Sequence, residues 1–77
     1  MKAAKLTAAT ITDWQIRDFE IDELRRRRSS VKRWAAVDLA TQALDSADPV
    51  TGVRSAAAIA ARARCAEILN VRTKECK

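Results

Sequence analysis

The sequence predicts an all-α fold, a small three-helix bundle, and three observations support this class. The chain has 77 residues, which leaves room for one domain. Sixteen residues are alanine, and Ala stands at the head of the helix-propensity ranking. A single proline and a single glycine, Pro49 and Gly52, lie close together, where they separate helical segments.

The first helix is expected over about residues 13–28, after a flexible N-terminal arm at 1–10 that shows no periodicity. Thr12, followed three residues later by Gln15, predicts a capping box at the start of this helix. Acidic residues come first along the helix and basic residues last, an order that complements the helix dipole. Three acid and base pairs have the i, i+4 spacing of helical ion pairs: Asp13/Arg17, Asp22/Arg26 and Glu23/Arg27.

Ser29 and Ser30 mark either a tight turn or part of a helix that continues to residue 46. We prefer the turn, because no other residue between the arginines and the next apolar segment readily caps a helix. A second helix is then expected over about residues 30–46. Steps of three, four and three residues predict that its buried face contains Trp34, Val37, Thr41 and Leu44, with Ala40 beside them.

The next loop is expected at residues 47–52, because this segment holds the proline and the glycine. A third helix is expected over about residues 53–73, so the domain spans 11–74 and a short tail follows at 75–77. Small side chains on its inner face favour close packing of helix axes. This face contains Ala58, Ala61, Cys65, Ile68 and Leu69, with Arg64, Glu67 and Asn70 opposite.

The composition argues against an enzyme and against a bound cofactor or metal. The chain has no histidine and no tyrosine, and it lacks a glycine-rich phosphate loop. Cys65 and Cys76 do not match the usual zinc spacings, so we expect one thiol in the core and one exposed in the tail. Asp18 and Asp22 share a helical face that suits a metal ion, but a solvated acidic face is the preferred interpretation.

Lysines interrupt the N-terminal segment before it reaches the length of a signal peptide or a membrane span. We therefore expect a cytoplasmic protein without membrane contact. Its pI of about 9.9 favours anionic partners.

Basic residues crowd the junction between the first two helices. The window 24–34 contains six bases and no acid. Guanidinium groups bind phosphate and carboxylate oxygens, so we expect a binding surface formed by Arg25, Arg26, Arg27, Arg28, Lys32 and Arg33. The alternative is a solvated helix end that complements the dipole. Trp14 is a further candidate for a partner contact, whereas Trp34 is expected in the core rather than stacked on a nucleic-acid base.

The supply of large apolar side chains predicts self-association. Beside its alanines and cysteines the chain has nineteen large apolar residues, which barely furnish one core. Trp14 and Ile21 lie outside the main apolar face of the first helix. We expect this surplus to be covered in a homodimer.

The segments ITDWQIR (11–17) and ARARCAEILNVR (61–72) resemble a group of short helical proteins of phages and other mobile elements. That group typically opens with ITDxQI and closes with ARxxCAxxIN. This chain departs from it at Arg25 to Ser30, where a glycine-containing turn would be expected. The resemblance carries over no functional residue. It implies a small accessory protein of a mobile element.

In that context we expect a non-enzymatic binding protein that blocks or modulates a nucleic-acid-handling machine of the host. Small anti-CRISPR and other anti-defence proteins act in this way, by occupying the surface of a host protein or nucleoprotein complex. Two alternatives remain open. One is a basic regulator that binds DNA or RNA through the arginine cluster, and the other is an assembly factor of a phage particle.

Overall fold

The computed structural model describes residues 5–75, and within this range it contains three α-helices and no strand. These are α1 (Asp13–Arg26), α2 (Ser30–Ala43) and α3 (Ala56–Glu75). All three helices contact one another, so the predicted all-α three-helix bundle is confirmed. The predicted breaks at Ser29 and at the loop with Pro49 are confirmed as well.

Capping determines where α1 begins. The backbone N–H of Gln15 donates to Oγ1 of Thr12 at 3.2 Å, and the N–H of Thr12 donates to Oε1 of Gln15 at 2.8 Å. This reciprocal pair is the predicted capping box. Ile11 and Ile16, on either side of the cap, are both buried in the core. The cap therefore couples the first turn of α1 to the core.

The helix ends differ from the predicted ranges 13–28, 30–46 and 53–73. Arg27 takes an extended conformation, which ends α1 two residues early. α2 ends at Ala43, whose carbonyl oxygen accepts a hydrogen bond from Arg62. α3 begins only after Ser55, whose Oγ accepts from the N–H of Ala58 at 3.1 Å as a side-chain cap does.

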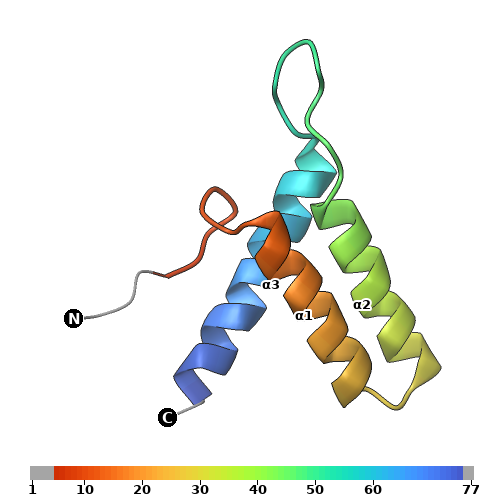
Figure 1. Ribbon diagram of the computed structural model, residues 1–77. Helices are drawn as coiled ribbons and strands as arrows, with labels where there is room; N and C mark the ends of the chain where they lie inside the picture. Colours follow the sequence, from red (N-terminus) through yellow and green to blue (C-terminus); the bar gives the residue numbers. More distant parts are fainter. Residues whose placement is uncertain (1–4, 76–77) are drawn as a thin grey trace.

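The bundle is flat, with principal extents of 41 × 39 × 17 Å. α1 and α2 form a hairpin, and α3 crosses this pair at an angle (Figure 1). The first turn of α1, the last turn of α2 and the first half of α3 meet at one end of the hairpin. Towards the other end, α3 diverges from α1 and α2 (Figure 1). Even so, Arg72 in the C-terminal half of α3 reaches Asp22 and Glu23 near the end of α1.

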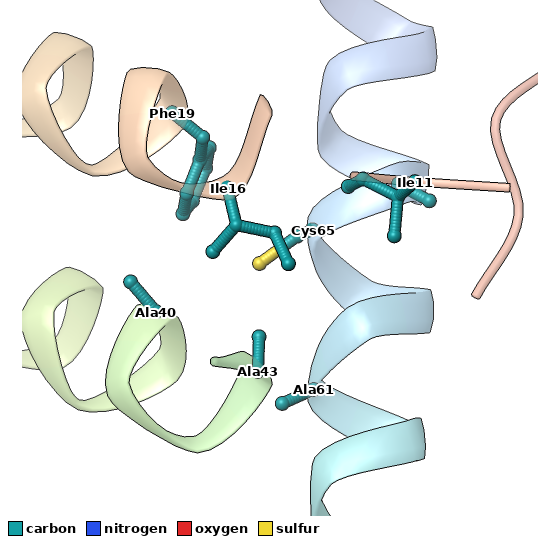
Figure 2. Close-up of a cluster of buried hydrophobic side chains, with 8 residues drawn as sticks. Ile11, Ile16, Phe19, Ala40, Ala43, Ala61 and Cys65 are labelled. Carbon is teal, nitrogen blue, oxygen red and sulfur yellow. The ribbon is translucent and has the colours of Figure 1, made fainter. Parts of the chain in front are cut away.

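The core combines a few large side chains from one element with alanines from the other two. Ile16 and Phe19 of α1 point toward Ala40 of α2 and Cys65 of α3 (Figure 2). Each of these four residues is at most 2% exposed. Alanine lets the helix axes approach closely, so α2 and α3 pack through their backbones as much as through side chains. The predicted inner face of α3 lies on this core, with Ile68 and Leu69 partly buried at its margin.

The predicted buried face of α2 is wrong for Trp34 and Thr41, although Ala40 is buried and Leu44 packs against the core. Its buried residues are Ala36, Ala40 and Ala43, whereas Trp34 is 67% exposed and Thr41 is also exposed. The alanines follow steps of four and three residues, so they form a helical stripe of their own. Trp34 precedes Ala36 by two residues, which places it on the opposite side of the helix, so it is turned outwards.

The segment before α1 is attached to α3, although a flexible arm was predicted at 1–10. The N–H of Leu6 donates to Oδ1 of Asn70, and Nδ2 of Asn70 donates to the carbonyl of Leu6, both at 2.9 Å. Thr7 and Thr10 close a turn through their side chains and backbone. The remainder of the predicted arm, residues 1–4, lies outside the described residues, as does the predicted exposure of Cys76. Asn70 is half-buried by this contact, so it is not on the outer face as expected.

The conformation of the loop at 44–55 depends on hydrogen bonds to Asp48 and on the backbone freedom of Gly52. Oδ1 of Asp48 accepts from the N–H of Val50 at 2.7 Å, and this turns the chain at Pro49. Gly52 has φ of 71°, in the left-handed region that favours glycine.

Candidate binding surface at the corner between α1 and α2

The predicted basic cluster forms a corner, which we define as residues 24–37. It comprises the last turn of α1, the turn at 27–29 and the first two turns of α2. All six predicted basic residues of the corner are exposed. Ser29 occupies the N-cap position of α2, but its side chain makes no capping hydrogen bond. The first turn of α2 contains no acidic residue. The positive end of the α2 dipole and the basic side chains therefore reinforce each other.

Two arginines of the corner are engaged in ion pairs within α1. Nε of Arg26 lies 3.0 Å from Oδ2 of Asp22, and Nε of Arg27 lies 2.9 Å from Oε2 of Glu23. Both pairs have the predicted i, i+4 spacing. These two arginines are thus held by acids one turn earlier, and their charge is partly compensated.

The other four cations have no acidic partner among the described residues. They are Arg25, Arg28, Lys32 and Arg33. The structure distributes them over different sides of the corner. Arg33 lines a groove together with Trp34. Lys32 and Arg27 line a second hollow, which also includes residues of α3. Arg25 lines a third hollow, between α1 and α3. The cluster is continuous in sequence, but its free charges do not form one patch.

Trp34 lies on the side of the corner that carries Arg33. Together with Leu24, Ser30 and Val37, these two residues line a groove of about 240 Å³, the Trp34 groove. Most of its lining is apolar, and Arg33 in this lining has no ion pair among the described residues. This arrangement combines the residue types that dominate binding hot spots, Trp and Arg. Trp34 was predicted to be buried, so this component of the surface was missed.

Trp14, the other predicted contact residue, is 73% exposed but lies far from the corner. It occupies the first turn of α1, about 17 Å along the helix axis from Arg25, given 1.5 Å of rise per residue. The structure therefore does not bring Trp14 together with the basic cluster.

Arg72 of α3 contacts two acids near the end of α1, where the corner begins. Its Nη1 lies 2.7 Å from Oδ2 of Asp22, and its Nη2 contacts Oε1 of Glu23. Its guanidinium carbon also lies 5.4 Å from the centroid of the Phe19 ring, a cation–π arrangement. Glu23 is only 6% exposed, so its charge is compensated by Arg72 and Arg27 on either side. This network fixes the end of α1 on α3.

Arg62 of α3 is a second basic residue whose role depends on the tertiary structure. Although it is an arginine, it is only 5% exposed. Its guanidinium donates to Oδ1 of Asp13 at 2.9 Å, to the carbonyl of Ala43 at 2.9 Å and to the carbonyl of Ile11 at 2.7 Å. One side chain thus joins the start of α1, the end of α2 and the middle of α3. The only signal in the sequence was its spacing from Ala58, Ala61 and Cys65.

Asp13 was predicted to pair with Arg17, but in the structure it pairs with Arg62 and Arg54 instead. The hydrogen bond from Arg62 lowers the pKa of Asp13 below its ordinary value of 3.8, and the charges of Arg62, Arg54 and Arg17 act in the same direction. Nη2 of Arg54 lies at 3.9 Å from Oδ1 of Asp13.

The candidate metal ligands of the sequence and Cys65 can be placed within the described residues. The described residues contain no group of three or more potential His, Cys, Asp or Glu ligands, which leaves Asp18 and Asp22 without further donors. Burial raises the pKa of the Cys65 thiol, so this sulfur is a packing atom rather than a nucleophile at neutral pH. Within residues 5–75, no helix combines the length and hydrophobicity needed to cross a membrane.

Comparison with known proteins found no matching protein family, no matching curated protein and no matching solved structure.

Proposed function

We propose that this chain is a non-enzymatic binding protein that uses the Trp34 groove as its principal contact. The observation that carries this proposal is an indole ring that is 67% exposed beside the apolar groove and Arg33. A fold with so few large apolar residues gains stability by burying such a ring, but this one is left in water. Burial against a partner would recover that free energy.

The partner is a protein or nucleoprotein surface with an apolar recess and an acidic rim. The recess accepts Trp34, and the acidic groups pair with Arg33 and with Arg28 on the adjoining turn. The resemblance to proteins of mobile elements makes a nucleic-acid-handling machine of the host the expected target. The protein would then act in the cytoplasm, as an inhibitor that occupies a surface and needs no chemistry of its own.

The test compares two exposed tryptophans. Capture of a partner from host lysate, after nuclease treatment, is expected for the wild type and for Trp14→Ala at low micromolar concentration. Trp34→Ala is expected to weaken the interaction by about 2 kcal/mol or more, about thirtyfold, as truncation of an interface hot spot does. Equal binding by the two variants would refute the Trp34 groove as the contact surface.

A second candidate function, direct binding of DNA or RNA, is favoured by the cations of the corner that lack an acidic partner. Aromatic side chains next to arginine provide stacking platforms for bases. The two tryptophans again separate the possibilities. In Trp14→Phe the only indole is Trp34, and titration with a single-stranded oligonucleotide should quench its fluorescence if bases stack there. In Trp34→Phe the remaining indole should respond little.

Salt dependence gives an independent discrimination between these two functions. Binding to nucleic acid should weaken steeply with salt concentration, with a slope of about 0.7 to 0.9 per phosphate contact. Binding through Trp34 to a protein recess should depend on salt only through the rim charges.

A further inference from the structure

Four residues of α1 form a stripe on the side opposite its buried residues. The buried residues of α1 are Ile16, Phe19 and Glu23. The stripe, which we call the outer stripe, consists of Trp14, Arg17, Asp18 and Ile21, all of them exposed. Steps of three, one and three residues place these side chains on one helical face. The outer stripe is separate from the Trp34 groove, with which it shares no residue.

The chain itself does not use the outer stripe. Trp14 is 73% exposed and Ile21 is 49% exposed. Arg17 and Asp18 take part in no ion pair among the described residues, although their neighbours Asp22 and Arg26 do. Two large apolar groups and two opposite charges are therefore presented to solvent together.

The order of residue types in the outer stripe is self-complementary when the helix direction is reversed. Read forwards it is aromatic, basic, acidic, aliphatic, and read backwards it is aliphatic, acidic, basic, aromatic. Two antiparallel copies related by a twofold axis between positions 17 and 18 would place Trp14 against Ile21 of the second copy. The same axis places Arg17 against Asp18 of the second copy. Interfaces with twofold symmetry require this kind of self-complementarity.

We propose that α1 pairs antiparallel with α1 of a second copy through the outer stripe. Symmetry makes each contact occur twice, so the dimer contains two contacts between tryptophan and isoleucine and two ion pairs. A parallel arrangement would instead place like charges opposite each other, which is unfavourable. The pattern of charge, as well as the exposed apolar surface, therefore favours antiparallel pairing with a second copy of this chain.

A hollow at one end of the outer stripe suits the indole ring of the second copy. It measures about 290 Å³, and its lining residues are Asp18, Phe19, Ile21, Asp22, Arg25, Leu69 and Arg72. This volume lies at the lower end of the range of ligand pockets, a size suited to a single side chain. Arg25, which takes part in no ion pair among the described residues, also lines this hollow, where a guanidinium can stack on the entering ring. In the antiparallel pair, Trp14 of the second copy faces this hollow.

The dimer is expected to be weak. One helix face of this length buries less than the roughly 1,200 Å² of a standard interface, which places it among transient associations. The Trp34 groove remains outside the contact, so each dimer presents two corners. Bivalent presentation would raise the avidity for a target with repeated sites.

Charge reversal tests the pairing. In analytical ultracentrifugation at low salt, from about 10 μM to about 1 mM, the wild type should show a reversible monomer and dimer equilibrium. In Arg17→Asp, an acid faces Asp18 of the second copy at both symmetry-related contacts. In Asp18→Arg, a base faces Arg17 of the second copy at both contacts. Each single variant should associate at least about tenfold more weakly than the wild type.

Two combinations make this test specific to the antiparallel register. The double variant Arg17→Asp with Asp18→Arg restores opposite charges and should dimerise again. A mixture of the two single variants should form a heterodimer, since one presents two acids and the other two bases. Asp38→Arg, which reverses an exposed acid on α2 that forms no ion pair within residues 5–75, is the matched control and should leave dimerisation unchanged.

Circular dichroism of each variant separates loss of association from loss of fold. A wild type that stays monomeric at about 1 mM would overturn the proposal. Dimerisation that survives both single reversals would also overturn it, as would folded single variants that fail to associate when mixed. Trp34→Ala should dimerise like the wild type, so failure of the proposed function and failure of this pairing remain distinguishable.

Discussion

The arginines of α3 and the arginines of the corner have the same side chain and opposite surroundings. Arg62 and Arg72 lie against carboxylates and backbone carbonyls and are largely shielded from water. Arg28 and Arg33 are exposed and have no ion pair among the described residues. Some arginines of this chain therefore connect helices, whereas others lie on the surface of the corner. A count of charges by sequence region does not separate these roles.

The difference has an energetic consequence. A buried guanidinium loses hydration, and hydrogen bonds to several acceptors offset that loss. Removing it leaves the acceptors buried without donors, which is costly. An exposed guanidinium is solvated with or without a partner, so its removal costs the fold little. Stability measurements should thus rank these arginines by burial.

Arg62→Ala should have the largest effect. It leaves the buried carbonyls of Ile11 and Ala43 without their donor, which costs about 1–3 kcal/mol for each carbonyl, and it removes the main partner of the more exposed Asp13. This loss is comparable to the whole stability of a domain of this size. Urea denaturation followed by circular dichroism gives the free energy of unfolding. Arg54→Ala, which removes a more exposed arginine 3.9 Å from the same carboxylate, is the control and should cost far less. Similar losses in both variants would contradict the ranking by burial.

Arg72→Ala should have the next largest effect. It removes one of two arginines from the buried carboxylate of Glu23, while Arg27 remains. We expect a loss of about 1–3 kcal/mol, the cost of an incompletely satisfied buried group. A double-mutant cycle with Glu23→Gln should show a coupling energy, because both residues belong to one network. Arg64→Ala, which removes an exposed ion pair with Glu67, should change stability by less than about 1 kcal/mol.

Acidification should reveal the contact between Asp13 and Arg62. The pKa of Asp13 is lowered in the folded state relative to its ordinary value of 3.8. Its contribution to stability is therefore complete above that value and is lost as pH falls through the folded pKa. The Asp13 side chain is 57% exposed, so water screens the interaction and the effect is modest.

Denaturation of the wild type and of Asp13→Asn measures this effect. The difference in free energy of unfolding between the two proteins should be constant near neutral pH and should shrink below about pH 4. A difference that grows on acidification would show that the sign of the coupling is wrong.

The exposed arginines should have the smallest effect on stability. Replacing Arg25, Arg28 and Arg33 together with alanine should cost less than about 0.5 kcal/mol for each position. Partner binding should nevertheless fall, because Arg33 lines the Trp34 groove and Arg28 lies on the adjoining turn. Surface plasmon resonance with the captured partner, or an oligonucleotide titration, would measure the loss. Unchanged binding by this folded triple variant would show that the corner is only a capped helix end.

Signals within a few residues of sequence were sufficient for the secondary structure. The capping box at Thr12, the break at Ser29 and the loop around Pro49 each depend on neighbours along the chain, and each is confirmed. Helix ends were predicted less well. Nothing in the run of arginines indicates that Arg27 leaves the helix, and the side-chain cap of Ser55 was overlooked.

The candidate surface was only partly predictable. The basic residues of the corner were found from their density, but Trp34 was assigned to the core because apolar periodicity does not distinguish a large side chain from a small one. α2 has two candidate stripes, one with Trp34 and Val37 and one with Ala36, Ala40 and Ala43. Which stripe faces the core depends on how closely α3 approaches, a property of the assembled bundle.

By itself the sequence determined that this protein has three helices, where they are separated and which segment carries excess positive charge. These features follow from backbone propensity, capping and charge order, which act over one or two helical turns. Only the tertiary structure decided that Arg62 is buried and Trp34 exposed. The acceptors of Arg62 lie up to 51 residues away in sequence, and they come together only when the start of α1 and the end of α2 pack on α3. Close packing through alanine then leaves the larger ring outside.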